Sequence, residues 1–115
     1  MNLYDSAHAL ARAIRESEEV RECARLKEIA EADETNRTLL GEYKRLQVAL
    51  QVQAMGGAQA GEDDMRRFQQ ISSLLYMNSD VQAYLLAEMR LQRMMADVFQ
   101  IITEASGLNL DMLNA

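Results

Sequence analysis

The sequence lacks proline and tryptophan and contains a single cysteine and a single histidine. One cysteine excludes an internal disulfide framework. A zinc site built from cysteines and histidines is excluded by the same count, as are the paired Glu-x-x-His motifs of di-iron bundles. Bases are in the minority, with 12 lysines and arginines against 18 acids and a net charge of −6. We therefore expect no direct nucleic-acid binding, which depends on basic residues, and no metal or cofactor.

Long hydrophobic runs are also missing, and none approaches the roughly 20 residues that a membrane-spanning helix needs. The first residues, MNLYDSAHALARAIRE, lack the basic segment and apolar stretch of a secretory signal. The glycine-rich segment 56–61 has neither a preceding strand nor the Gly-Lys-Ser/Thr ending of a phosphate-binding loop. These absences predict a cytoplasmic protein with no membrane contact, no catalytic apparatus and no small-molecule substrate.

What the sequence does contain is helix-forming residues. Alanine occurs 16 times and leucine 15 times, against 13 for valine, isoleucine and threonine together. Alanine and straight-chain residues lose little freedom in a helix, whereas β-branched residues lose more. With 115 residues the chain has enough material for one core. The composition predicts a single all-α domain over residues 1–115, a bundle of four to five helices with two long antiparallel helices.

Capping residues and apolar spacing predict where the helices lie. The first should begin at Asp5 or Ser6, and the fourth should follow the glycine-rich segment. The other three are expected over about 18–32, about 34–55, and from the caps at 78–80 to about 106. Gly107 suits the position just after a helix end. The last eight residues, 108–115, keep four apolar side chains and are expected either to dock on the bundle or to fray.

Two surfaces are candidates for protein contacts. In the third helix, apolar residues recur at steps of four, three and four: Leu39, Tyr43, Leu46 and Leu50. Two long apolar seams in so small a chain could bury more surface than one copy covers, which suggests a homodimer through this stripe or that of the fifth helix. In the fifth helix, Met89 lies beside Arg90 and Arg93. Methionines there are either core residues or an adaptable contact surface ringed by arginines.

Two single residues stand out for their surroundings. Glu88 interrupts an apolar row, so it is expected to be a structural carboxylate paired with an arginine, since a buried carboxylate needs a partner. The candidate partners are Arg45, Arg66, Arg67 and Arg93. A general acid or a metal ligand at Glu88 is the alternative. Cys23 lies on the apolar side of the second helix, and either acts as a small hydrophobic residue or is a reactive thiol.

The sequence resembles the small bacterial YlbF/YmcA-like regulators, and within them the uncharacterised YheA-type branch. The resemblance is carried by pattern and spacing over nearly the whole chain: Leu3-Tyr4-Asp5, Ala9-Leu10, Ala13-Ile14-Arg15, Ser17-Glu18-Glu19, Ala32-Asp33-Glu34, Tyr43, Leu46-Gln47, Asn78 and Ala87-Glu88-Met89-Arg90-Leu91. It implies a compact helical protein that often dimerises and has no catalysis of its own.

Some relatives act in a complex that modulates the endoribonuclease RNase Y, which implies a role in mRNA processing through a partner. Relatives in that complex have been linked to iron–sulfur clusters. This sequence departs from them, because Cys23 alone could not hold a cluster without thiolates from other chains.

Three functional hypotheses follow. The first is a non-enzymatic regulator or adaptor that acts through protein contacts, possible partners being family members or an RNase Y-type complex. The second is a self-assembling structural protein whose homodimer is the active form. The third is an enzyme assembled at a dimer interface from carboxylates such as Glu88. Co-purification with a defined partner favours the first, recovery of the protein alone favours the second, and a deep polar pocket with clustered acids favours the third.

Overall fold

The computed structural model describes residues 2–56 and 61–108. Within these residues the chain is all-helical and has no strand, as predicted. The five helices are α1 (Leu3–Arg15), α2 (Glu18–Glu31), α3 (Glu34–Met55), α4 (Glu62–Tyr76) and α5 (Ser79–Ser106). Most of the predicted glycine loop and of the tail expected to dock or fray lies outside the described residues.

Four of the helix boundaries follow from local capping chemistry. The side chains of Ser17, Asp33 and Asn78 accept hydrogen bonds from the first free backbone N–H groups of α2, α3 and α5. At the end of α5, Gly107 adopts a φ of 69°, a left-handed conformation that glycine reaches without steric cost. These caps lie where the sequence predicted them.

The start of α1 differs from the prediction. The helix begins at Leu3, ahead of both Asp5 and Ser6. Its cap is Asn2, whose Oδ1 accepts a hydrogen bond of 2.8 Å from the backbone N–H of Asp5. Asp5 is therefore inside the first turn, where its negative charge is attracted by the positive end of the helix dipole and stabilises the helix.

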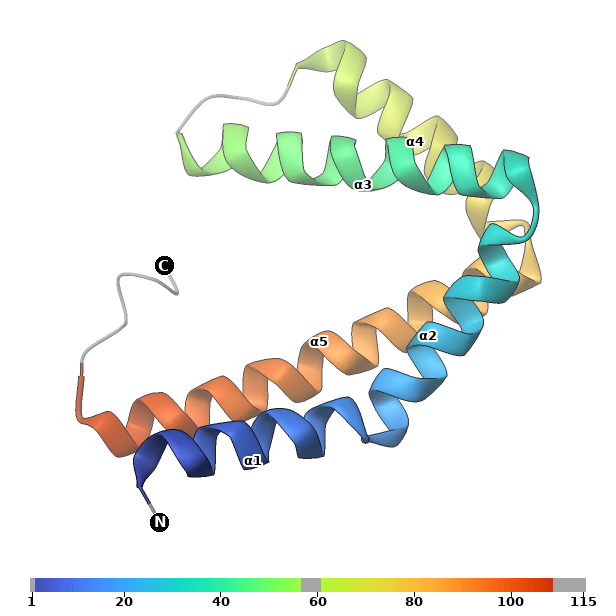
Figure 1. The fold of residues 1–115 in the computed structure, drawn as a ribbon. Coiled ribbons are helices and arrows are strands. Elements are labelled where there is room, and N and C mark those ends of the chain that lie inside the picture. Colours follow the sequence, from blue (N-terminus) through green and yellow to red (C-terminus); the bar gives the residue numbers. More distant parts are fainter. Residues whose placement is uncertain (1, 57–60, 109–115) are drawn as a thin grey trace.

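The helices form a V with two arms, as Figure 1 shows. One arm is the antiparallel pair α3 and α4, and the other consists of α5 with α2 and α1 beside it. The long helices α3 and α5 start close together at the closed end, the apex, and diverge toward the open end. Each long helix therefore pairs with shorter antiparallel helices of its own arm. The molecule measures 49 × 37 × 16 Å, so its thickness is little more than one helix diameter of about 10–12 Å.

The hydrophobic core lies at the apex. The buried residues of the described chain are Cys23, Ala30, Leu40, Tyr43, Ile71, Leu75, Val81, Tyr84, Leu85 and Ala87. They come from the part of each helix nearest to the apex, and α1 contributes none of them. A slab one helix thick has no interior away from the point where the arms meet, so the outer halves of both arms keep large apolar side chains at the surface.

Candidate protein-interaction surfaces

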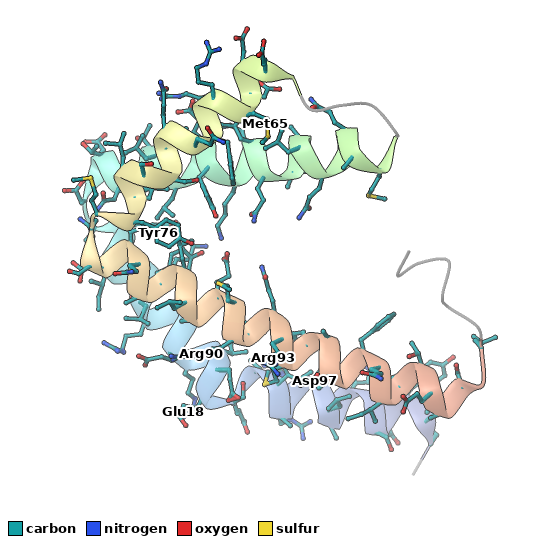
Figure 2. All side chains as sticks on the ribbon, turned by 180° about the vertical axis from the view of Figure 1, so that it is seen from behind. Glu18, Met65, Tyr76, Arg90, Arg93 and Asp97 are labelled. Carbon is teal, nitrogen blue, oxygen red and sulfur yellow. The ribbon has the colours of Figure 1, made fainter. Side chains whose placement is uncertain are left out.

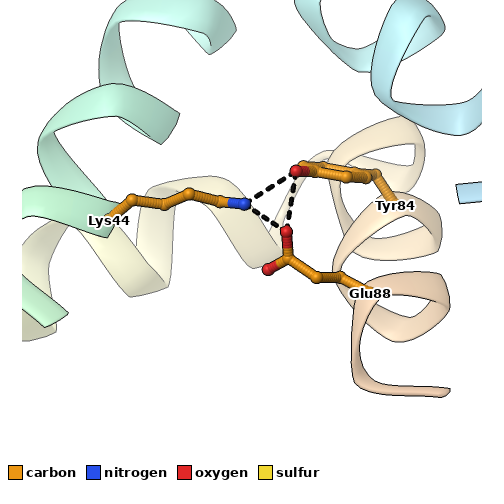
Figure 3. Close-up of polar contacts among 3 residues, drawn as sticks. All are labelled: Lys44, Tyr84 and Glu88. Carbon is orange, nitrogen blue, oxygen red and sulfur yellow. Dashed lines mark hydrogen bonds and ion pairs between the residues drawn. The ribbon is translucent and has the colours of Figure 1, made fainter. Parts of the chain in front are cut away.

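A polar cluster ties the two arms together at the apex (Figure 3). Lys44 of α3 donates hydrogen bonds to the Glu88 carboxylate and, at 2.7 Å, to the Tyr84 hydroxyl. Tyr84 in turn donates to Glu88 at 2.9 Å. The ammonium also lies 5.0 Å from the centre of the Tyr84 ring, within range of a cation–π interaction. Each of the three groups is therefore held by the other two, and together they join α3 to α5.

The partner of Glu88 is thus a lysine and not one of the four candidate arginines. Arg67 instead pairs with Glu42 at 2.7 Å, between α4 and α3. Lys44 and Glu88 are separated by 44 residues, and nothing local in the sequence sets how the two arms meet. The Glu88 side chain is 22% exposed, so the carboxylate is partly buried, and its Oε2 accepts from both Lys44 and Tyr84.

The protonation of this cluster follows from its surroundings. Partial burial disfavours the charged form of Lys44, but hydrogen bonds to Glu88 and Tyr84 outweigh this effect and raise the pKa of the lysine. Burial, aided by the bond to Glu88, also raises the pKa of the Tyr84 hydroxyl. At neutral pH Lys44 is therefore charged and Tyr84 is neutral, the combination that the hydrogen bonds require.

Cys23 lies in the core, only 8% exposed. Burial, reinforced by the nearby negative charge of Glu88, raises the pKa of its thiol. A thiol with a raised pKa forms little of the reactive thiolate at neutral pH. The surroundings of Cys23 fit a small hydrophobic residue better than a redox or cluster-binding group.

The predicted stripe on the third helix faces α4 of the same chain. Tyr43 is buried and stacks on Phe68, with the ring centres 5.0 Å apart. Leu39 and Leu46 are partly buried against the core. Leu50 lines an open apolar groove of about 320 Å³ between α3 and α4. Much of this stripe is therefore occupied within one chain.

The predicted residues on the fifth helix are exposed. Met89 is 59% exposed, and Arg90 and Arg93 are also at the surface. Figure 2 shows Arg90, Arg93 and Asp97 along one side of α5. We call the surface formed by Met89, Arg90, Arg93 and Asp97 the outer row, because it lies on the side of α5 away from Glu88.

An acidic surface adjoins the outer row. Glu18, Glu19 and Glu22 of α2 line an open groove of about 310 Å³ together with Ala87 and Arg90 of α5. A hydrogen bond from Arg25, aided by the charges of Arg25 and Arg90, lowers the pKa of Glu22. The structure therefore brings these three glutamates next to Arg90, one of the predicted arginines, in a groove that carries both signs of charge.

A second apolar surface lies on the sides of α3 and α5 that face each other. Its α5 half belongs to the apolar stripe predicted for the fifth helix, whereas its α3 half was not predicted. Its members are Val48, Val52 and Met55 on α3 and Met95, Phe99 and Ile102 on α5, with exposed fractions between 41% and 88%. The available signal was helical spacing from Lys44 and from Glu88, which places each triplet on the same face as the tie at the apex.

The described residues offer neither a metal-binding cluster nor a membrane-spanning helix. In residues 2–56 and 61–108, no three histidine, cysteine or acidic side chains are placed to hold a metal ion together. Among the same residues, no helix combines the length and the apolar character needed to cross a membrane.

Comparison with known proteins agrees with the fold. The protein is 33% identical over 111 residues to a UPF0342 protein of Caldicellulosiruptor saccharolyticus, with 96% of this chain and 92% of the relative covered. It is 37% identical over 103 residues to a UPF0342 protein of Alkalihalophilus pseudofirmus, with 90% and 87% covered.

A solved structure is similar over most of its length. The protein of unknown function (DUF964) from Bacillus stearothermophilus matches with a TM-score of 0.76 and 26% identity, covering 91% of this chain and 92% of that one. The profile described as "Control of competence regulator ComK, YlbF/YmcA" matches residues 3–105. The chain therefore belongs to the YlbF/YmcA family.

Proposed function

We propose that this protein is a non-enzymatic regulator that acts through protein–protein contacts, and that the outer row of α5 and the adjoining acidic groove form its partner-binding surface. The observation that carries the proposal is the division of α5 into two sides. One side carries the polar tie to the other arm at Glu88 and apolar side chains farther along the helix, whereas the outer row is charged and exposed and has no member in the core. Exposed arginines beside a methionine are typical of protein interfaces.

The surroundings of the titratable groups support a non-enzymatic role. The carboxylate with the most unusual position, Glu88, is engaged by Lys44 and Tyr84. The groove near Arg90 is open to solvent and sits on the surface rather than enclosing a substrate. General acid–base catalysis needs a titratable group held against a bound substrate. Glu88 is held by its two partners, and the glutamates near Arg90 line a groove that is open to solvent.

The proposed partner is a protein of the bacterial cytoplasm, either another YlbF/YmcA-type family member or an RNase Y-type complex. The family description names control of a competence regulator, and the link to ribonuclease complexes comes from some relatives. Such a partner would meet arginines of the outer row with acidic groups and the acidic groove with basic ones. A role in mRNA processing would then belong to the complex rather than to this acidic chain alone.

The test is tagged co-purification from the native host, quantified by mass spectrometry. We expect the wild type to recover RNase Y or another family member, and the double variant Arg90→Glu/Arg93→Glu to lose at least about tenfold of that partner, as lost interface charge pairs do. Arg66→Glu, an exposed arginine on the other arm, is the matched control and should retain it. Equal recovery by all three proteins would show that the outer row is not the site.

A second candidate function is self-assembly, with a homodimer as the active form. The observation in its favour is the small core, which is confined to the apex and leaves the outer halves of the arms uncovered. Recovery of the protein alone, with a dimeric mass, would favour this function over the regulator.

A further inference from the structure

A pocket beside the polar cluster lies at the apex, where α2, α3 and α5 meet. Its volume is about 300 Å³, at the lower end of the range of about 300–1,000 Å³ for small-molecule sites. Apart from one leucine, it is lined by Lys27 and Glu31 of α2, by Arg37, Gly41 and Lys44 of α3, and by Tyr84 of α5. The pocket is therefore large enough for a small ligand and is built from three helices.

The charge of this pocket is opposite to that of the whole chain. Three of the 12 lysines and arginines line it together with a single acid, Glu31, so the lining carries a net charge of +2. The whole chain carries −6. A concave site lined by one sign of charge attracts ligands of the other sign. The pocket therefore favours an anion.

Each of the three cations keeps N–H groups for a ligand. Lys27 is exposed and has no salt bridge with another described residue. Arg37 meets Glu34 only at 4.0 Å, the limit for an ion pair, and its side chain is 62% exposed. The ammonium of Lys44 has three N–H groups, of which the polar cluster uses two (Figure 3). Because the Lys44 side chain is 38% exposed, the third N–H can reach a ligand.

Gly41 is an independent observation that points to the same pocket. It lies inside α3, where glycine is less stable than alanine, so its presence calls for a packing or a functional reason. Packing does not supply one, because a Cβ at Gly41 would meet only the Arg45 guanidinium, at an ordinary 3.5 Å. The space that the missing side chain leaves open is that of the pocket, which Gly41 lines.

We propose that this pocket, the anion pocket, binds the phosphoryl group of a small organic phosphate of the sugar-phosphate class. A phosphate monoester carries nearly two negative charges at neutral pH, which matches the +2 of the lining. The Arg37 guanidinium offers two parallel N–H groups to phosphate oxygens, and Lys27 and Lys44 add point charges. Glu31 accepts hydrogen bonds from the hydroxyls of the ligand. Outside the pocket the chain is strongly acidic, which disfavours a long polyanion such as a nucleic acid.

The test is isothermal titration calorimetry on the full chain at constant ionic strength. The probes are ribose 5-phosphate, inorganic phosphate and ribose, which has no phosphate. Ribose 5-phosphate should bind saturably at one site per chain, with a dissociation constant below about 1 mM. Inorganic phosphate should bind more weakly, because it has no hydroxyl groups on a carbon skeleton to reach Glu31, and ribose should not bind.

Four variants locate the binding site. Lys27→Ala and Arg37→Ala should each weaken the binding of ribose 5-phosphate at least about tenfold, because each removes a hydrogen bond between charged groups. Gly41→Leu changes no charge and favours the helix, and should weaken binding by a similar factor because its side chain fills the pocket. Arg21→Ala is the control: Arg21 is an exposed cation on the same helix as Lys27 but is not among the lining residues. Lys44 is left unchanged because it also joins the arms.

Three results would overturn the proposal: no saturable binding of ribose 5-phosphate by the unmodified protein, equal binding of ribose, or equal affinities of the Lys27, Arg37 and Arg21 variants. Glu31→Ala tests the organic part of the ligand. It should abolish the preference for ribose 5-phosphate over inorganic phosphate, and a preference that persisted would contradict the role of Glu31. The anion pocket goes beyond the partner-binding proposal and does not depend on it, since Arg90 and Arg93 do not line this pocket.

Discussion

At the scale of single residues, Glu88 shows how a polar group can hold an open fold together. Its carboxylate accepts from Lys44 and Tyr84, which come from different arms. We expect Glu88→Ala to lower the free energy of unfolding by about 1–3 kcal/mol, because it leaves Lys44 and Tyr84 without their shared acceptor. Glu28→Ala, at an exposed position of α2, should change it by less than about 0.5 kcal/mol. Equal melting temperatures for the two variants would contradict this assignment.

The same cluster predicts that the stability of the folded protein decreases at alkaline pH. The pKa values of both Lys44 and Tyr84 are raised in the folded state. For each group the stabilisation is therefore complete below its unfolded pKa, which is about 10, and is lost as the pH rises through the higher folded value. Urea midpoints measured between pH 8 and 11 should fall toward pH 11. The urea midpoint of the double variant Lys44→Met/Tyr84→Phe should decrease less than that of the wild type over this pH range. An equal decrease in both proteins would contradict a stabilising role for the cluster.

At the scale of helices, Gly41 within α3 and Gly107 just after α5 should respond oppositely to replacement by alanine. A Cβ at Gly41, in the middle of α3, would meet only the Arg45 guanidinium at 3.5 Å, an ordinary contact. Gly41→Ala should therefore stabilise the protein by about 0.5–1 kcal/mol through helix propensity. Gly107→Ala should destabilise it by about 1 kcal/mol, since Gly107 has a φ of 69°. In thermal unfolding, the melting temperature should therefore rise for Gly41→Ala and fall for Gly107→Ala.

Helix boundaries were predictable because capping is local. Ser17, Asp33 and Asn78 each bind backbone groups within three residues, so the sequence alone reveals them. The pairing of Lys44 with Glu88 was not predictable, because it depends on how two arms meet. The stripe containing Tyr43 was identified correctly as apolar, but periodicity cannot tell whether its partner is α4 of the same chain or a second chain.

At the scale of the whole molecule, a single copy has its core at one end, and this has a thermodynamic consequence. If the homodimer of the second candidate function forms, part of the stability of each chain comes from its partner, and the melting temperature rises with protein concentration. We expect the wild type to melt several degrees higher at 100 μM than at 1 μM, because mass action adds about 1.4 kcal/mol for each tenfold increase above the dissociation constant.

The variant Phe99→Asp distinguishes stabilisation by a partner chain from the stability of the single chain. As a monomer it should melt at one temperature across the same concentrations, and below the wild type, since the apolar surface on the facing sides of α3 and α5 would have no cover. Leu86→Asp, at an exposed position on the opposite side of α5, should keep the concentration dependence of the wild type. If the wild type melted independently of concentration, the arms would have to be stable on the apex core alone. The 28-residue helix α5, whose buried residues all lie between Val81 and Ala87, would then be held mainly by its contacts with α2 and α4.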